Sequence, residues 1–279
     1  MKIGISGASG KLGAGVVDNL LRRGGIEVVG VSRTPTGVTA HEARFGDYDQ
    51  PESLAAAYAG LDRLLIIPTT SLAPGQRAKQ NVAAIDAANR AGVRHVAFMS
   101  SAGVRARPEP DVWASYFAAE QHLMRTATSW SVLRMNYYIE SFADEARRAL
   151  DQGSLAGLGE NKVAFVSRAD LAAAAAGLLA GAGHDGAIYT GTGPRAWSVA
   201  ERVALVSGLS GKPLNAVELT ADALRAGFTQ AGLPPHIVEI ALSIRQGFVD
   251  GGFDIVTGDI EKLSGRPPRS MEDALIDAF

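Results

Sequence analysis

Short apolar runs alternate with longer, alanine-rich segments through the first half of the chain. The runs are rich in β-branched residues and apolar at successive positions, which is typical of strands that helices cover on both faces of a sheet. This alternation predicts an α/β protein with a Rossmann-like, doubly wound parallel sheet. The expected strands are residues 3–5, 28–31, 43–45, 64–67, 93–99, 131–134 and 187–189, with the weakest patterns at 43–45 and 187–189.

Helix signals fall between these strands. Residues 12–23, 51–58 and 76–90 are expected to be helices, and each segment ends close to a glycine, a residue that readily takes the left-handed conformation after a helix. After about residue 136 the alternation is less regular, and residues 220–250 are expected to be helical with a break at two consecutive prolines. The second half of the chain is therefore expected to form a smaller C-terminal lobe.

The strongest local signal is a glycine-rich turn between the first expected strand and the first expected helix. Free backbone N–H groups and the helix dipole hold a phosphate at such a place, and glycines let the backbone approach a pyrophosphate closely. The spacing is GxxGxxG instead of the GxGxxG of dehydrogenases, and an ordinary tight turn is the alternative interpretation. We expect the turn to bind a dinucleotide cofactor through Gly7, Ser9, Gly10, Lys11, Leu12 and Gly13.

The residue about 20 positions after the glycines indicates which cofactor is bound. NAD-binding folds place an acidic group there, at the end of the second strand, to bind the ribose hydroxyls, whereas this sequence has Arg33. A guanidinium binds a 2′-phosphate through two charge-assisted hydrogen bonds, and a carboxylate would repel it. The sequence therefore predicts NADP(H) in preference to NAD(H), and an arginine on a solvated strand end is the alternative.

Further cofactor contacts are expected after the later strands, because ligands of open α/β sheets lie at the carboxyl ends of the strands. Asp47 follows the third expected strand, where its carboxylate can accept a hydrogen bond from adenine or can belong to the loop. Pro68 and Thr69 follow the fourth strand, either as cofactor contacts or as a plain turn. Ser100 and Ser101 end the fifth strand, and we expect Ser100 to contact the cofactor.

Several segments together resemble the NmrA-like group of atypical short-chain dehydrogenases, closest to its NADPH-dependent quinone oxidoreductase and triphenylmethane reductase branch. The resemblance covers most of the chain and is weakest in the last 60 or so residues. It implies a Rossmann domain over residues 1–135, a substrate-binding lobe formed mainly by residues 136–279, and a return of about 163–192 to the first domain. The segments that carry it are the glycine-rich turn and residues 31–33, 95–101, 133–138 and 167–170.

The sequence departs from the short-chain dehydrogenases at their catalytic lysine, which lowers the pKa of a tyrosine in the motif YxxxK. Counting from Tyr116, the lysine position holds Glu120, and no lysine occurs between Lys79 and Lys162. Several NmrA-like reductases keep a lysine just after the glutamate, and Gln121 takes that place as an expected cofactor contact. Without a cationic neighbour Tyr116 remains a neutral phenol of ordinary pKa, so its substitution by phenylalanine is expected to change little.

This departure argues against an alcohol dehydrogenase and favours transfer of hydride to a quinone or a similar planar electrophile, which needs mainly a stacked, oriented acceptor. The candidate catalytic residues are Ser101, Tyr116 and Tyr138, for which a turn cap and core packing are the alternative roles. Two other functions stay open. One is an NmrA-like redox sensor that binds NADP without turnover, and the other is a nucleotide-sugar epimerase or dehydratase, which normally needs the tyrosine and lysine pair.

Composition excludes several further classes. The net charge of −2 without a long run of like charge gives little support to a nucleic-acid or anionic-membrane surface. With no cysteine and five scattered histidines, disulfides are excluded and no metal site is expected. The N-terminus reaches glycine too early for a signal peptide, and the longest apolar stretch, residues 171–183, is too short for a membrane span. We expect a cytoplasmic protein, either a monomer or a homodimer.

Overall fold

The computed structural model describes residues 1–108 and 111–279. Its centre is a seven-stranded sheet in the order β3-β2-β1-β4-β5-β6-β9, in which every neighbouring pair is parallel. All seven runs expected from the sequence lie in this sheet, so the prediction of a Rossmann-like parallel sheet is confirmed. The strands are β1 (Lys2–Ser6), β2 (Glu27–Ser32), β3 (Glu42–Phe45), β4 (Arg63–Ile66), β5 (His95–Ser101), β6 (Trp130–Met135) and β9 (Ala187–Gly191).

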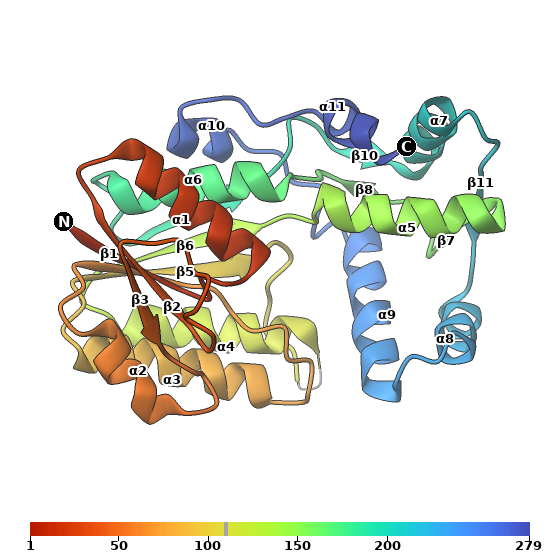
Figure 1. Ribbon diagram of the computed structural model, residues 1–279. Helices are drawn as coiled ribbons and strands as arrows, with labels where there is room; N and C mark the ends of the chain where they lie inside the picture. The colour runs from red at the N-terminus through yellow and green to blue at the C-terminus, as the bar shows by residue number, and fades with distance from the viewer. Residues whose placement is uncertain (109–110) are drawn as a thin grey trace.

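Helices cover both faces of the sheet (Figure 1). On one face lie α1 (Lys11–Arg23), α6 (Arg168–Ala180) and α10 (Asp259–Ser264), and on the other lie α2 (Pro51–Tyr58), α3 (Gln76–Arg90) and α4 (Val112–Thr126). The strands are apolar at successive positions for this reason. Leu64 and Ile66 belong to the apolar cluster on the side of α2 to α4, and Leu65 between them belongs to the cluster on the side of α1 and α6.

Alanine dominates α6 because this helix is enclosed by the sheet, α1 and α10. The contacts are close: a Cβ atom added at Gly177 would lie 1.8 Å from the carbonyl oxygen of Leu263 in α10, and one at Gly15 in α1 would lie 3.0 Å from the Cβ of Ala172. Small side chains let three helices pack in this space. Residues 171–180 of the apolar stretch therefore belong to a core helix. No helix within the described ranges could span a membrane.

Other elements of the second half of the chain lie together in a lobe beside the carboxyl ends of the strands, whereas β9, α6 and α10 belong to the sheet and its covering layer (Figure 1). In this lobe β7 pairs in parallel with β11, and β8 pairs with β10 in antiparallel fashion. The predicted break in residues 220–250 is confirmed, because α8 ends before the two prolines and α9 begins at the second. The elements are α5 (Ile139–Gln152), β7 (Ser154–Gly157), β8 (Lys162–Val163), β10 (Trp197–Ser198), α7 (Val199–Ser210), β11 (Asn215–Glu218), α8 (Ala221–Gln230), α9 (Pro235–Val249), α11 (Met271–Leu275) and the 3-10 turn Ile276–Ala278.

Two of the links between the lobe and the sheet involve residues 167–170. Ser167 caps α6 by accepting a hydrogen bond from the Asp170 backbone N–H at 3.0 Å. The carboxylate of Asp170 is fully buried and lies 2.8 Å from the guanidinium of Arg266 in the C-terminal segment. The backbone N–H of Arg168 donates to Glu140 in α5 at 3.0 Å. The segment 167–170 thus connects α6, α5 and the chain beyond α10. These contacts explain why polar residues stand directly before the alanine-rich part of α6.

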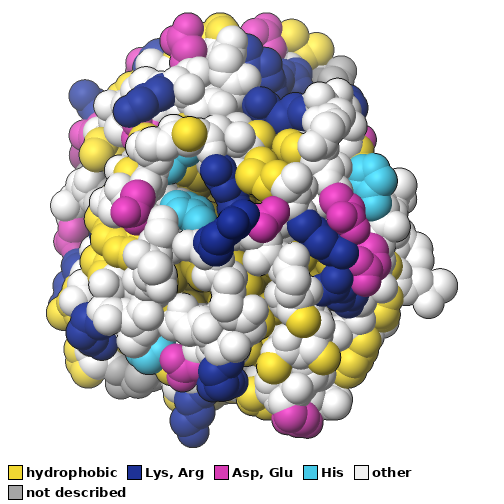
Figure 2. Space-filling model, turned by 90° about the vertical axis from the view of Figure 1, so that its left-hand side faces the viewer, with side chains coloured by type: hydrophobic (Ala, Val, Ile, Leu, Met, Phe, Trp, Pro, Cys, Tyr) yellow, Lys and Arg dark blue, Asp and Glu magenta, His cyan; other side chains and the backbone are white. Residues whose placement is uncertain are grey.

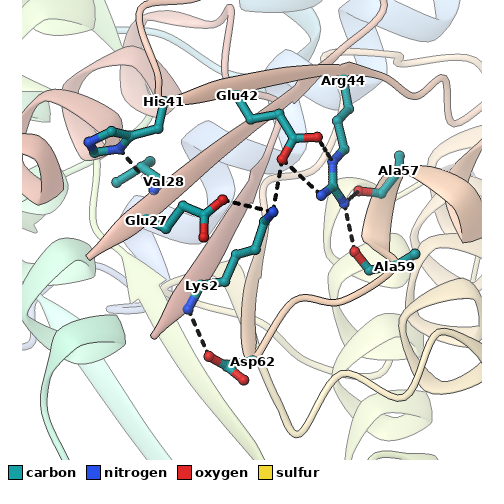
Figure 3. Close-up of polar contacts among 9 residues, drawn as sticks. All are labelled: Lys2, Glu27, Val28, His41, Glu42, Arg44, Ala57, Ala59 and Asp62. Carbon is teal, nitrogen blue, oxygen red and sulfur yellow. Dashed lines mark hydrogen bonds and ion pairs between the residues drawn. The ribbon is translucent and has the colours of Figure 1, made fainter. Parts of the chain in front are cut away.

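A network of charged side chains ties the first three strands together at their amino ends (Figure 3). The Lys2 ammonium lies 2.8 Å from Glu27 Oε1 in β2 and 2.9 Å from Glu42 Oε2 in β3. Arg44 donates to Glu42 Oε1 at 2.7 Å and to the carbonyl oxygens of Ala57 and Ala59 at the end of α2. The Glu42 carboxylate therefore joins β1, β3 and α2.

This network predicts a pH dependence of stability. The hydrogen bonds from Arg44 first, and from Lys2 second, lower the pKa of Glu42 from 4.5 to about 2. Because the folded-state pKa lies below the unfolded one, the stabilisation is complete above pH 4.5 and is lost as the pH falls towards 2. The variant Glu42→Gln should flatten this part of the curve of unfolding free energy against pH. If urea titrations of Glu42→Gln at a series of pH values showed the same loss of unfolding free energy below pH 4.5 as the unaltered protein, the role assigned to Glu42 would be wrong.

Candidate cofactor and active site

The glycine-rich turn lies where the strand order reverses, between β1 and its neighbours β2 and β4. Gly7 has a φ of +94°, a region that favours glycine. A Cβ atom added at Gly13 would lie 2.2 Å from the carbonyl oxygen of Gly7, so the first turn of α1 rests directly on the end of β1. The backbone N–H groups of Gly7 and Ala8 donate to the Val31 carbonyl at 3.0 and 3.1 Å, which fixes the turn against β2.

Backbone donors are free at this place. Gly10 is the N-cap of α1 and has no side chain to cap it. Within the described ranges, the N–H groups of Lys11, Leu12 and Gly13 have no acceptor. Three free donors at the positive end of a helix dipole, beneath a turn without bulky side chains, fit the pyrophosphate of a dinucleotide.

The second strand ends beside this turn. Ser32 is buried and its hydroxyl donates to Ser9 Oγ at 2.8 Å, so that the two predicted segments meet. The next residue, Arg33, is exposed, and the part of the chain that the structure describes offers its guanidinium neither a hydrogen bond nor an ion pair. After the hydrogen bonds from Gln76 and Gln80, the charge of Arg33 helps to lower the pKa of Asp49. The guanidinium forms no ion pair among the described residues and is available for a 2′-phosphate.

The residues after β3 and β4 form one polar chain. Gln80 and Gln76 of α3 donate to Asp49 Oδ1 at 2.7 and 3.0 Å, and Thr69 donates to Gln80 Oε1 at 2.6 Å. Asp47 accepts a hydrogen bond from the Asp49 backbone N–H at 3.0 Å, as a turn residue does. The role of Asp47 towards adenine stays a prediction. The links through Asp49, Gln76 and Gln80 have no sequence signal, because they join three separate segments.

The end of β5 presents two serines in different environments. Ser100 is fully buried, and its hydroxyl has no partner within the described ranges. Ser101 is 7% exposed and its hydroxyl donates to the Ala102 carbonyl at 3.1 Å. Both serines are therefore buried, and Ser101 alone of this pair keeps a small exposed fraction. Pro68 and Thr69 follow the adjacent strand β4 and are half-buried.

Two tyrosines lie beyond the carboxyl ends of β5 and β6, each with an arginine over its ring. The guanidinium carbon of Arg77 lies 4.8 Å from the ring centre of Tyr116, and that of Arg168 lies 5.0 Å from the ring centre of Tyr138. Burial raises the pKa of Tyr116, and Arg77 acts against this rise. Burial, and next the nearby Tyr116, raise the pKa of Tyr138. Both tyrosines therefore stay protonated at neutral pH and lie close enough to influence each other.

The residue at the lysine position of YxxxK has a structural partner. Glu120 is 1% exposed and accepts two hydrogen bonds from Arg134 of β6, to Oε1 at 2.9 Å and to Oε2 at 2.6 Å. This bidentate pair fixes α4 against β6 and gives the carboxylate a structural role. Gln121 is the next residue and is half-buried. Arg134 lies in the segment 133–138, which the resemblance includes. The sequence does not indicate that Arg134 pairs with Glu120, because the two residues are 14 positions apart.

The other aromatic residues after β6 belong to the core of the lobe. The Tyr137 hydroxyl donates to Glu145 Oε1 at 2.5 Å, and its ring contacts Phe248 edge-on at 5.0 Å between ring centres. Phe142 is 1% exposed and packs on Phe165. Tyr138 is consequently the aromatic residue of this segment that remains a candidate for the site. The described residues contain no cluster of side chains that could hold a metal ion.

The opposite edge of the sheet also has a hollow, where histidine and basic side chains gather (Figure 2). The cavity has a volume of about 350 Å³ and lies beside Arg63, Arg94 and His184. Its cations already have acceptors: Arg63 donates to the Leu179 carbonyl at 2.6 Å, and Arg94 pairs with Asp62 at 2.5 Å. This hollow is at the amino ends of the strands, away from the glycine-rich turn.

Comparisons with known proteins agree with this geometry. Quinone oxidoreductase 2 of Escherichia coli is 29% identical over 99% of this chain and 98% of its own length. A crystal structure of an Escherichia coli NADPH-dependent quinone oxidoreductase complexed with NADPH has a TM-score of 0.90 at 29% identity, covering 98% of both chains. The Citrobacter sp. triphenylmethane reductase complexed with NADP(H) has a TM-score of 0.86 at 27% identity, covering 100% of both.

These likenesses confirm the resemblance drawn from the sequence. The model of a family described as NAD(P)H-binding matches residues 7–181, which begin at the first glycine of the turn and end just after α6. The free helix donors, the glycine contacts and the unpaired Arg33 fit that cofactor on the observations of this structure itself. The chain therefore belongs to the NAD(P)H-binding family.

Proposed function

We propose that the protein is an NADPH-dependent reductase that transfers hydride to a quinone or a similar planar electrophile. The observation that carries the proposal is the meeting of a phosphate-binding turn, the unpaired Arg33 and two protonated tyrosines at one edge of the sheet. Relatives named for quinones and for triphenylmethane dyes support a planar acceptor. The absence of a lysine at the YxxxK position, where Glu120 is tied to Arg134, argues against alcohol chemistry.

Different groups of this chain would bind the cofactor and donate the proton. NADPH, when bound, supplies a hydride, which carries two electrons. The turn would hold its pyrophosphate on the N–H groups of α1, and Arg33 would hold its 2′-phosphate. Reduction of a quinone to a hydroquinone also requires one proton on an acceptor oxygen. A buried, protonated tyrosine such as Tyr116 or Tyr138 can donate it, and Ser101 at the end of β5 can orient the acceptor oxygen.

Turnover tests the proposal directly. Oxidation of NADPH should be followed with a panel of quinones and triphenylmethane dyes, beside titrations of NADPH and NADP⁺ binding. Reduction of planar acceptors before simple ketones or alcohols is the expected result. Tight binding that discriminates NADPH from NADP⁺, without turnover of any acceptor, would replace the proposal with a redox sensor.

Arg33 should determine the choice of cofactor. Its guanidinium has no partner within the described ranges, and a charge-assisted contact contributes roughly 1.5–3 kcal/mol, so NADPH should bind about ten- to a hundredfold more tightly than NADH. The variant Arg33→Ala should erase most of this preference in fluorescence titrations. Arg90→Ala, an exposed arginine at the far end of α3, is the control. Equal affinities in the unaltered protein would refute the assignment.

A further inference from the structure

Arg77 is a buried cation that forms no ion pair with any carboxylate of the described residues. It lies in α3, is 8% exposed, and donates from Nε to Ser115 Oγ at 2.9 Å. A longer contact of 3.5 Å joins its terminal nitrogen to the Val112 carbonyl. In residues 1–108 and 111–279 no carboxylate forms an ion pair with it. Burial of an unpaired guanidinium is costly, so the position calls for a physical reason.

The face of Tyr116 occupies the space opposite this guanidinium. The two groups are 4.8 Å apart, within the range of a cation–π interaction. The anchor Ser115 is the residue directly before Tyr116, and its hydroxyl also donates to the Val112 carbonyl at 3.1 Å. The first turn of α4 therefore sets the position of both the cation and the phenol.

The second arginine–tyrosine pair, Arg168 with Tyr138, differs from the first in its charge balance and in the hydrogen bond of its tyrosine. Arg168 lies 3.9 Å from Glu140 Oε1, so a carboxylate offsets its charge. The Tyr138 hydroxyl donates to the Met135 sulfur at 2.9 Å. Among the residues that the structure describes, the cation beside Tyr116 has no carboxylate partner and the Tyr116 hydroxyl has no hydrogen-bond partner. Its phenol is therefore the one of the two that is free to donate and whose anion a nearby charge would stabilise.

We propose that Arg77 is the positioning residue that activates Tyr116 as the proton donor, in the place of the absent lysine. The inference rests on the proposed function and deepens it. The Tyr116 O–H bond breaks as the acceptor oxygen takes the proton, while hydride from NADPH supplies both electrons and yields the hydroquinone. The resulting phenolate is stabilised by Arg77 and takes its proton back from water. The structure thus reverses the expectation that Tyr116 lacks a cation.

The electrostatic part is tested without any acceptor. A difluorotyrosine at position 116 titrates at lower pH than tyrosine and absorbs differently when ionised. Adding Arg77→Met should raise its pKa by about 1, because one opposite charge near the ring is removed. Arg105→Met is the matched control, since Arg105 stacks on Trp113 of the same helix at 5.5 Å. An unmoved pKa overturns the inference, whether or not quinones are reduced.

The kinetic part uses quinone turnover. Tyr116→Phe should lower kcat by about a hundredfold, the scale of a lost general acid, and Arg77→Met by about tenfold, with NADPH affinity unchanged. Arg77→Lys should recover part of the loss, because it restores the charge. The double variant should be no slower than Tyr116→Phe alone, because both act on one proton transfer. Losses that multiply would overturn the inference.

A further variant tests the proposal in case the Arg77→Met protein does not fold. Ser115→Ala removes the hydroxyl that holds Arg77 Nε without removing a charge, and it should move the titration in the same direction by a smaller amount. No movement in a folded Ser115→Ala or Arg77→Met protein overturns the proposed role of Arg77. Failure of the unaltered protein to reduce any quinone overturns the proposed function instead, and the two failures are thereby distinguished.

Discussion

Gly10→Val should weaken the binding of both NADPH and NADH by about a hundredfold or more while the protein still folds. Gly10 is the N-cap of α1, directly before the free N–H groups of Lys11, Leu12 and Gly13. A branched side chain there would keep the pyrophosphate away from these donors. Loss of two charge-assisted hydrogen bonds at roughly 1.5–3 kcal/mol each corresponds to that factor.

The fold should tolerate this change because a Cβ atom at Gly10 meets only the Gly7 carbonyl oxygen, at an ordinary 3.4 Å. Gly13 differs, since its Cβ would lie 2.2 Å from the same oxygen, and Gly13→Val should destabilise the turn itself. The control is Gly208→Val, because nothing lies within 4 Å of a Cβ atom at Gly208 in α7. Normal cofactor titrations of a Gly10→Val protein with an unaltered circular dichroism spectrum would show that the turn is structural only.

Arg134→Met should destabilise the fold by about 3–5 kcal/mol, the usual cost of leaving a buried charge without its partner. The charge left behind is that of Glu120, which is 1% exposed and takes two hydrogen bonds from Arg134. Because the pair joins α4 to β6, its loss should also loosen the helix that carries Tyr116 and Arg77's anchor Ser115.

Urea unfolding of three variants measures this effect. Arg94→Met is the control, because the Arg94 side chain is 76% exposed in its pair with Asp62, and an exposed pair contributes roughly 0–1 kcal/mol. The double variant Glu120→Leu with Arg134→Met should recover much of the stability, since apolar groups can replace a buried ion pair. If Arg134→Met were no less stable than Arg94→Met, the Glu120–Arg134 pair would not stabilise the packing of α4 against β6 as its geometry indicates.

The hydrophobic pattern and local residue chemistry determine much of this protein without tertiary information. Runs such as residues 28–31 and 64–67 are apolar at successive positions because both of their faces are covered, and that property is visible in the sequence. The glycine-rich turn is equally local, since the eight consecutive residues 6–13 form the end of β1, the turn and the start of α1. Arg33 follows at a distance along the chain that the strand–helix–strand unit sets. The sheet and the cofactor class could therefore be predicted, and the role of the turn as the phosphate site stays a prediction.

Only the tertiary structure decided which residues face one another across elements. Arg77 and Ser115 are 38 positions apart, and Glu120 and Arg134 are 14 apart. No period along the chain brings such pairs together, because their meeting depends on how α3, α4 and β6 pack. The same packing buries Ser100 completely and leaves Ser101 7% exposed, although the two serines are neighbours in sequence. The sequence could show that the catalytic lysine is missing, but the cation beside Tyr116 comes from a different helix, and the packing of α3 against α4 alone places it there.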